Sequence, residues 1–137
     1  MSGVGRAVRW ALFLAWAAAV WNLSARSDPK SDLSFPWEIP DKVAHAAEYA
    51  VGGFLARAAF ASVGARRAWS AAVVACALWG MVDEIHQGFV PGRATDPFDL
   101  VADVTGAALG AAVHAGLRRR GAPATGRPGA ADPPRPA

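Results

Sequence analysis

The sequence predicts an all-α integral membrane bundle of four transmembrane helices with a disordered C-terminal tail. Of its 137 residues, 53% are hydrophobic and only 18% are charged, whereas a soluble domain carries about 25% charged residues. Four apolar segments also recur along the chain, each close to the roughly 20 residues that cross about 30 Å of hydrocarbon as a helix. A soluble helical bundle is the alternative, but so many apolar segments leave too little polar surface to solvate it.

The first apolar segment covers residues 7–23 and carries no charge after Arg9. Its length and composition predict the first transmembrane helix. A cleaved signal peptide is the alternative, but Leu23 stands at the candidate cleavage site, where a small residue is preferred. We therefore expect the segment to remain as a membrane span.

The other three segments cover residues 43–63, 68–89 and 98–117. The second begins after Pro40-Asp41, a favourable helix start. Only the first and third segments are expected to pass a strict hydropathy filter, because charged and histidine side chains interrupt the second and fourth. Those side chains are His45, Glu48 and Arg57 in the second segment and Asp99, Asp103 and His114 in the fourth.

Two regions follow from this pattern. Residues 1–120 are expected to form one four-helix transmembrane domain. Residues 121–137 are rich in proline, glycine and alanine and have no apolar periodicity, which predicts a disordered and dispensable tail.

Basic residues predict the orientation of the bundle. With four spans, both termini and the turn at residues 64–67 share one side. That side carries nine arginines against three basic residues on the other, so the positive-inside rule places both termini in the cytoplasm. We therefore expect a multi-pass protein of the plasma membrane. The compared residues are Arg6, Arg9, Arg66, Arg67, Arg118, Arg119, Arg120, Arg127 and Arg135 against Arg26, Lys30 and Arg93.

Polar residues recur in the outer halves of the second, third and fourth segments. Asp41, His45 and Tyr49 are spaced four apart, so they lie on one helix face. Ionisable groups inside a membrane are costly and usually functional, which predicts a polar cup that opens outward. The expected binding residues of this cup are Asp41, Lys42, His45, Tyr49, Asp83, Glu84, Gln87, Arg93, Asp99 and Asp103.

Pairing inside the cup is predicted from depth and chain order. The polar stripe of the second span is expected to face Asp83, Glu84 and Gln87 of the third, which should be its antiparallel neighbour. Arg93 follows a Pro-Gly turn and is expected to fold back over Glu84, Asp83 or Asp99. The alternative is that these residues form a purely structural network that caps helix ends and holds the spans together.

Small residues predict how closely the helices approach. Ala102, Gly106 and Gly110 repeat every four residues in the fourth segment, as do Gly52 and Ala56 in the second. Such small-xxx-small seams allow helix backbones to come together in a membrane.

A family resemblance rests on three groups of residues. Together they resemble the VanZ-like family of small membrane proteins over about residues 10–115. One departure is Asp103, where the family is expected to have asparagine. The residues that carry the resemblance are Asp41-Lys42-x-x-His45-x-x-x-Tyr49, then Asp83-Glu84-x-x-Gln87-x-x-x-Pro91-Gly92-Arg93, then Asp99 and Gly106.

What the resemblance implies is a location in the cell envelope. The family is named for a protein associated with resistance to the glycopeptide antibiotic teicoplanin, and no biochemical mechanism comes with it. The first hypothesis is a binding protein for a membrane lipid or lipid-linked envelope precursor, with Lys42 and Arg93 on an anionic headgroup.

Two other functions stay open. The chain could be an acid–base hydrolase or transferase on an envelope lipid, with His45, Asp83 and Glu84 as candidate catalytic residues. It could instead be a helix-packing partner of another membrane protein or form a homo-oligomer through its small-residue seams.

No cofactor and no metal ion are expected. The spacings H-x-x-E and D-E-x-H around residues 45–48 and 83–86 match no strong metal signature, although His45, Glu48, Asp83, Glu84 and His86 are usable ligands. Nucleic acid is excluded as a partner, because the basic residues form short separated clusters without interleaved aromatic residues.

Overall fold

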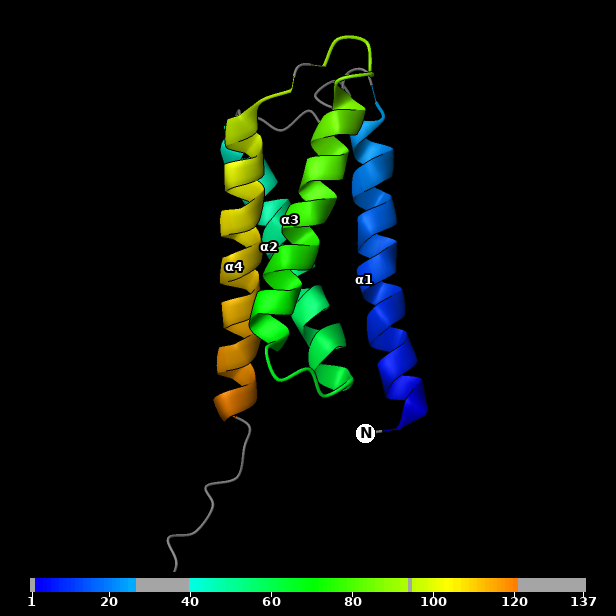
Figure 1. The fold of residues 1–137 in the computed structure, drawn as a ribbon, viewed down its shortest axis with the longest axis vertical. Coiled ribbons are helices and arrows are strands. Elements are labelled where there is room, and N and C mark those ends of the chain that lie inside the picture. Colours follow the sequence, from blue (N-terminus) through cyan, green and yellow to red (C-terminus); the bar gives the residue numbers. More distant parts are fainter. Residues whose placement is uncertain (1, 27–39, 94, 121–137) are drawn as a thin grey trace, which may run out of the picture.

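The computed structural model describes residues 2–26, 40–93 and 95–120, and within them the chain is an all-helical bundle. Neighbouring helices in the chain run in opposite directions (Figure 1). The prediction of an all-α fold with four helices is confirmed, while the predicted tail at 121–137 lies outside the described residues. The helices are α1 (Gly3–Ser24), α2 (Asp41–Ser62), α3 (Ala68–Gln87) and α4 (Pro97–Arg120).

Three helices, α1, α3 and α4, are long and apolar enough to cross a membrane. The expectation that the fourth segment would fail a strict hydropathy filter is wrong, because its acids cluster at its start and a long Ala/Gly/Val stretch follows. α2 falls short, since His45, Glu48 and Arg57 interrupt it. However, α2 packs against all three other helices, which partly covers its polar side chains His45, Glu48 and Arg57.

Glycines set the close approach of α2 and α4. A Cβ atom on Gly110 would lie 1.8 Å from the carbonyl oxygen of Ala50, and one on Gly106 would lie 2.0 Å from that of Ala46. Only a hydrogen atom fits at these positions, so the two backbones are in direct contact. The predicted seam of the fourth segment is therefore used inside the bundle.

The seam of α2 differs from the predicted one. Gly53, rather than Gly52, lies against α4, where its Cβ atom would be 2.1 Å from the carbonyl oxygen of Ala107. Gly52 instead makes room for the Trp16 ring of α1, and the Trp16 Nε1 donates to the Glu48 carbonyl oxygen at 3.1 Å. α2 is thus tied to α4 on one side and to α1 on the other.

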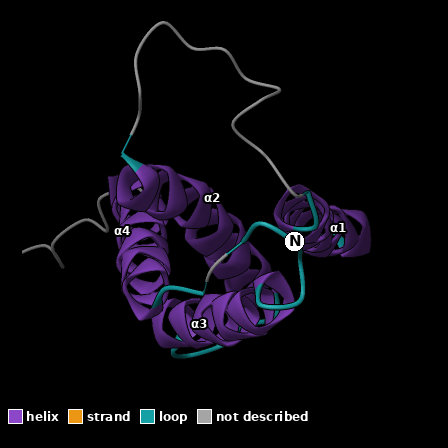
Figure 2. Ribbon diagram, turned by 90° about the horizontal axis from the view of Figure 1, so that it is seen from above, coloured by secondary structure: helices purple, strands orange, loops and turns teal. Residues whose placement is uncertain are grey.

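The helices are not packed evenly. Viewed along the bundle, α2, α3 and α4 form a tight group and α1 stands beside it (Figure 2). α1 packs on α2 and α3 but makes no close contact with α4. We call the end of the bundle near residues 24–26 and 88–96 the acidic end, and the end with the N-terminus and the turn at 63–67 the basic end (Figure 1).

Candidate functional site

At the acidic end, α2 and α4 share a histidine–carboxylate pair. The His45 Nδ1 lies 3.0 Å from an Asp103 carboxylate oxygen, and His45 Nε2 lies 3.8 Å from Asp99. Asp103 is only 2% exposed. A buried carboxylate on Nδ1 fixes the orientation of the imidazole and leaves Nε2 for another partner.

Lys42 places a positive charge beside the Asp99 carboxylate. Its ammonium group pairs with the carboxylates of Asp96 and Asp99, which lie just before and inside the first turn of α4. The hydrogen bond from Lys42 holds the pKa of Asp96 below its usual value, and a second bond from the Phe98 backbone N–H acts in the same direction. Lys42 therefore connects the starts of α2 and α4.

Asp83 belongs to a different contact. It accepts hydrogen bonds from the Ser24 hydroxyl of α1 and, at 2.8 Å, from the Gln87 amide one turn further along α3. The α2 stripe was predicted to face Asp83, Glu84 and Gln87, but His45 pairs with Asp103 of α4 and Asp83 with Ser24 of α1. The stripe still lies near α3, since Tyr49 is within electrostatic reach of Asp83, and His45 within reach of Glu84. Ser24 was missed, although it is the polar residue that ends the first apolar run.

Glu84 and Tyr49 carry polar atoms without partners. The Glu84 Oε2 accepts from the Asp96 backbone N–H at 3.1 Å, but its Oε1 is buried and unpartnered among the described residues. The Tyr49 hydroxyl, in a side chain 1% exposed, is likewise unpartnered there. A Cβ atom on Gly80 would meet both this hydroxyl and Asp103, so Gly80 makes room for the two side chains. Such unpaired groups cost free energy unless water or a ligand satisfies them.

Arg93 does not make the contact that its turn suggested. Its guanidinium donates to the carbonyl oxygens of Arg26, at 3.3 Å, and Leu23, at 3.5 Å. Arg93 thus caps the C-terminal end of α1, where the helix leaves unpaired carbonyls that favour a cation. It does not lie over Glu84, Asp83 or Asp99 as predicted.

One group of side chains has the spacing of metal ligands. Ligand atoms of Asp41, His45 and Asp99 lie within 4.8 Å of one another. This set shares only His45 with the residues that the sequence offered as ligands. Lys42 already occupies one oxygen of Asp99, which counts against a divalent cation at the same carboxylate.

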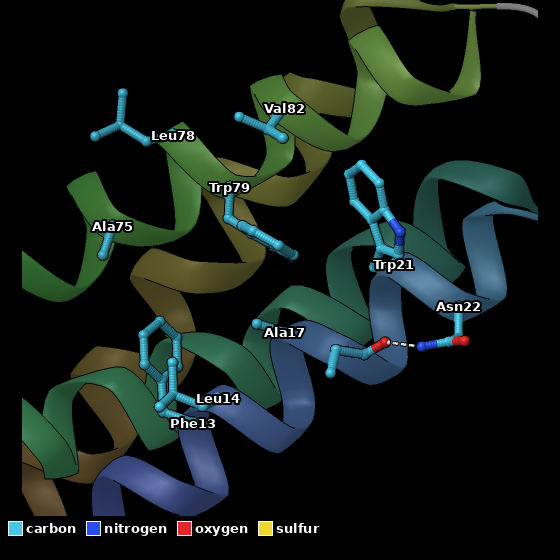
Figure 3. A pocket seen from close by; sticks show the side chains of 10 residues that line it. Phe13, Leu14, Ala17, Trp21, Asn22, Ala75, Leu78, Trp79 and Val82 are labelled. Atoms are coloured by element: carbon cyan, nitrogen blue, oxygen red, sulfur yellow. Dashed lines mark hydrogen bonds between the residues drawn. The ribbon is translucent and has the colours of Figure 1, made fainter. Parts of the chain in front are cut away.

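An apolar groove lies on the side of the bundle, between α1 and α3. It encloses about 750 Å³, and Trp21 and Trp79 lie on opposite sides of it (Figure 3). Val82 and Asn22 line it close to its acidic end. Val82 directly precedes Asp83 and Asn22 is two residues before Ser24, so the groove ends close to the polar contact that joins α1 and α3.

At the end of the bundle where the cup was predicted, the polar side chains form two separate hydrogen-bonded groups. Lys42, His45, Asp99 and Asp103 connect α2 to α4, and Glu84 joins them through Asp96. The second group connects α1 to α3. We refer to both together as the polar network, whose members are Ser24, Lys42, His45, Asp83, Glu84, Gln87, Asp96, Asp99 and Asp103.

Comparison with known proteins identifies the family of this chain. No curated protein and no solved structure matches the chain significantly. Residues 6–118 match the family model described as VanZ/LLP1, which covers all four helices. The chain therefore belongs to the VanZ/LLP1 family.

Proposed function

We propose that this membrane protein binds the polar headgroup of a membrane lipid or lipid-linked envelope precursor at its acidic end. In this proposal the chain is a multi-pass protein of the plasma membrane, both termini are cytoplasmic, and the acidic end faces the cell envelope. The charge bias of the described helix ends supports that orientation.

The observation that carries the proposal is the buried, unpartnered Glu84 Oε1 within the polar network. A carboxylate oxygen accepts hydrogen bonds, so it suits a hydroxyl or amino group of a ligand. An anionic headgroup is supported less, because Lys42 is paired with two aspartates and Arg93 caps α1. Headgroups rich in hydroxyl or amino groups, such as a glycan, fit the network better.

The apolar groove supports a lipid rather than a soluble ligand. It runs along the membrane-spanning parts of α1 and α3 and ends beside the polar network. A lipid could place its chain in the groove and its headgroup among the carboxylates. The glycine seams support a partner subunit less, since Gly53, Gly106 and Gly110 are covered within the bundle.

The test is lipid analysis of the purified full-length protein. Wild type is expected to retain an envelope lipid or lipid-linked precursor, and Glu84→Gln to retain at least about tenfold less of it. Glu48→Gln is the matched control, because Glu48 lies on α2 within electrostatic reach of the network but forms no side-chain hydrogen bond or ion pair with its residues. Equal lipid content in all three proteins would contradict the proposal.

A deletion strain connects the binding to the cell. Loss of the protein is expected to change the envelope-lipid profile, and glycopeptide sensitivity should be measured beside it. Wild type and Glu48→Gln should restore the profile, whereas Glu84→Gln should not. Reporter fusions at residues 65 and 32 should report opposite sides of the membrane, and the same side for both would refute the orientation.

An acid–base enzyme is the second candidate, favoured by the His45–Asp103 pair. Asp103 holds Nδ1, which leaves Nε2 to take a proton from a hydroxyl or water. This reading predicts that His45→Asn abolishes turnover of an extracted envelope-lipid fraction while lipid binding persists. If no lipid is converted by wild type, the site is a binding site alone.

A further inference from the structure

The basic end of the bundle contains no acidic side chain among the described residues. The helices there carry only arginine, histidine and uncharged residues. Every acid that the structure describes lies at the other end. These acids are Asp41, Glu48, Asp83, Glu84, Asp96, Asp99 and Asp103.

Arg57 is a cation within α2 at the basic end. It is five residues before the last residue of α2, which places it roughly 7 Å inside the helix end. One of its terminal nitrogens donates to the His114 Nδ1 of α4. Because arginine cannot accept a hydrogen bond, this imidazole must be neutral.

The contact with His114 fixes the guanidinium but does not neutralise it. His114 is buried and meets the Phe54 ring edge-on, with centroids 4.9 Å apart. The Arg57 Nε remains buried without a hydrogen-bond partner. The contact with His114 therefore orients the guanidinium, while no described residue satisfies its Nε N–H group.

Further arginines raise the positive charge around this pair. Arg118 and Arg119 lie close enough to interact electrostatically with Arg57, and Arg9 and Arg118 do so with His114. The helix dipole places a partial negative charge at the C-terminal end of α4. Three arginines in the last turn already lie beside that partial charge. Like charges held together in or near hydrocarbon require a counter-anion.

We propose that Arg57 and His114 form a binding site for the phosphate of an anionic phospholipid. The planar guanidinium would hold the phosphate through its free N–H groups, and Arg118 would reach it from the end of α4. The occupant is a lipid because Arg57 lies within a helix of the membrane bundle, where a headgroup of the adjacent leaflet can reach it. This site does not depend on the function proposed for the acidic end.

The experiment measures binding of phosphatidylglycerol to the full-length protein in detergent, with phosphatidylcholine as the neutral probe. Arg57→Gln is expected to weaken phosphatidylglycerol binding about tenfold or more. Arg66→Gln removes the same charge from the exposed turn at the same end and should lower it only slightly. Arg57→Lys keeps the charge but loses the planar guanidinium, which can donate two parallel hydrogen bonds to one phosphate. Its affinity for phosphatidylglycerol should therefore fall between those of wild type and Arg57→Gln.

Three results would overturn the proposal. Equal losses in Arg57→Gln and Arg66→Gln would mean that general surface charge attracts the lipid. Unchanged binding in Arg57→Lys would mean that the paired hydrogen bonds of the guanidinium are not used. If Arg57→Gln does not fold, the result with Arg57→Lys decides whether the proposal stands. Saturation of the site by inorganic phosphate at millimolar concentration, with no preference for phosphatidylglycerol over phosphatidylcholine, would exclude a lipid occupant.

Discussion

The two ends of the bundle are held by the same helix pair but are built in opposite ways. At the acidic end, His45 of α2 meets Asp103 of α4, and Lys42 bridges two further carboxylates. At the basic end, Arg57 of α2 meets His114 of α4 and no described acid is near. The acidic end joins basic side chains to carboxylates, whereas the basic end joins a cation to a neutral ring.

The difference shows that one close helix pair can carry two unlike polar contacts. Carboxylates and basic side chains at the acidic end stabilise each other inside the protein. The charge of Arg57 at the basic end has no acidic partner among the described residues. Removing a partner should therefore have opposite effects on stability at the two ends, and four predictions follow from that contrast.

The largest effect is expected from separating α2 and α4, on which both ends depend. Gly110→Ala would place a Cβ atom 1.8 Å from the Ala50 carbonyl oxygen, so the helices must move apart. We expect a loss of more than about 3 kcal/mol of stability, measured by unfolding in detergent. Gly116→Ala is the control on the same helix, since a Cβ atom there meets nothing within 4 Å. That control should be neutral or slightly stabilising, and equal losses in both variants would refute the close approach.

A somewhat smaller loss is expected at the acidic end. Asp103→Asn removes the charge that pairs with His45 in a site where Asp103 is 2% exposed. We expect a loss of about 2 kcal/mol, because a buried charged group loses its partner. The unfolding midpoint should be measured beside that of Glu48→Gln. If Asp103→Asn is as stable as that control, the pair does not stabilise the bundle.

The basic end should respond with the opposite sign. Arg57→Met keeps most of the side-chain volume and removes a charge that has no described acidic partner. In a neutral detergent we expect stability within about 1 kcal/mol of wild type, or above it, because repulsion from Arg118 and Arg119 is relieved. A loss as large as that of Asp103→Asn would show that the two ends are stabilised in the same manner.

The smallest effect is a pH dependence from the exposed Lys42–Asp96 pair. Asp96 has a pKa lowered by Lys42, so its contribution to stability is present above the ordinary carboxyl value of 3.8 and is lost as pH falls through the lowered value. Wild type should have a slightly higher melting temperature than Asp96→Asn at about pH 6, and this advantage should shrink as the pH falls below 3.8. A constant difference across this range would mean that the pair contributes nothing.

Much of the fold could be predicted from the sequence. Long apolar segments bounded by turns specify helices, and the acidic residues of three segments fall at matching distances from one end. Family membership could also be recognised, since the residues between Asp83 and Arg93 form a specific pattern. The hydropathy of the fourth segment was misjudged, because its acids are confined to its first turns.

The pairing of side chains could not be read from the sequence. Spacing shows that Asp41, His45 and Tyr49 share a face, but not which helix that face meets. Chain order suggested α3 as the partner, whereas the structure places Asp103 of α4 against His45.

The sequence by itself determined four helices, their approximate positions and the separation of acids from arginines, because these depend on local composition and on the rise of a helix. The tertiary structure decided how each helix is rotated about its axis. Gly53, Gly106 and Gly110 bring α2 and α4 into backbone contact, and that contact turns His45 and Arg57 toward α4. Rotation follows from the fit of two surfaces, which no single segment contains. The same packing turned Asp83 to Ser24 and Arg93 to the end of α1.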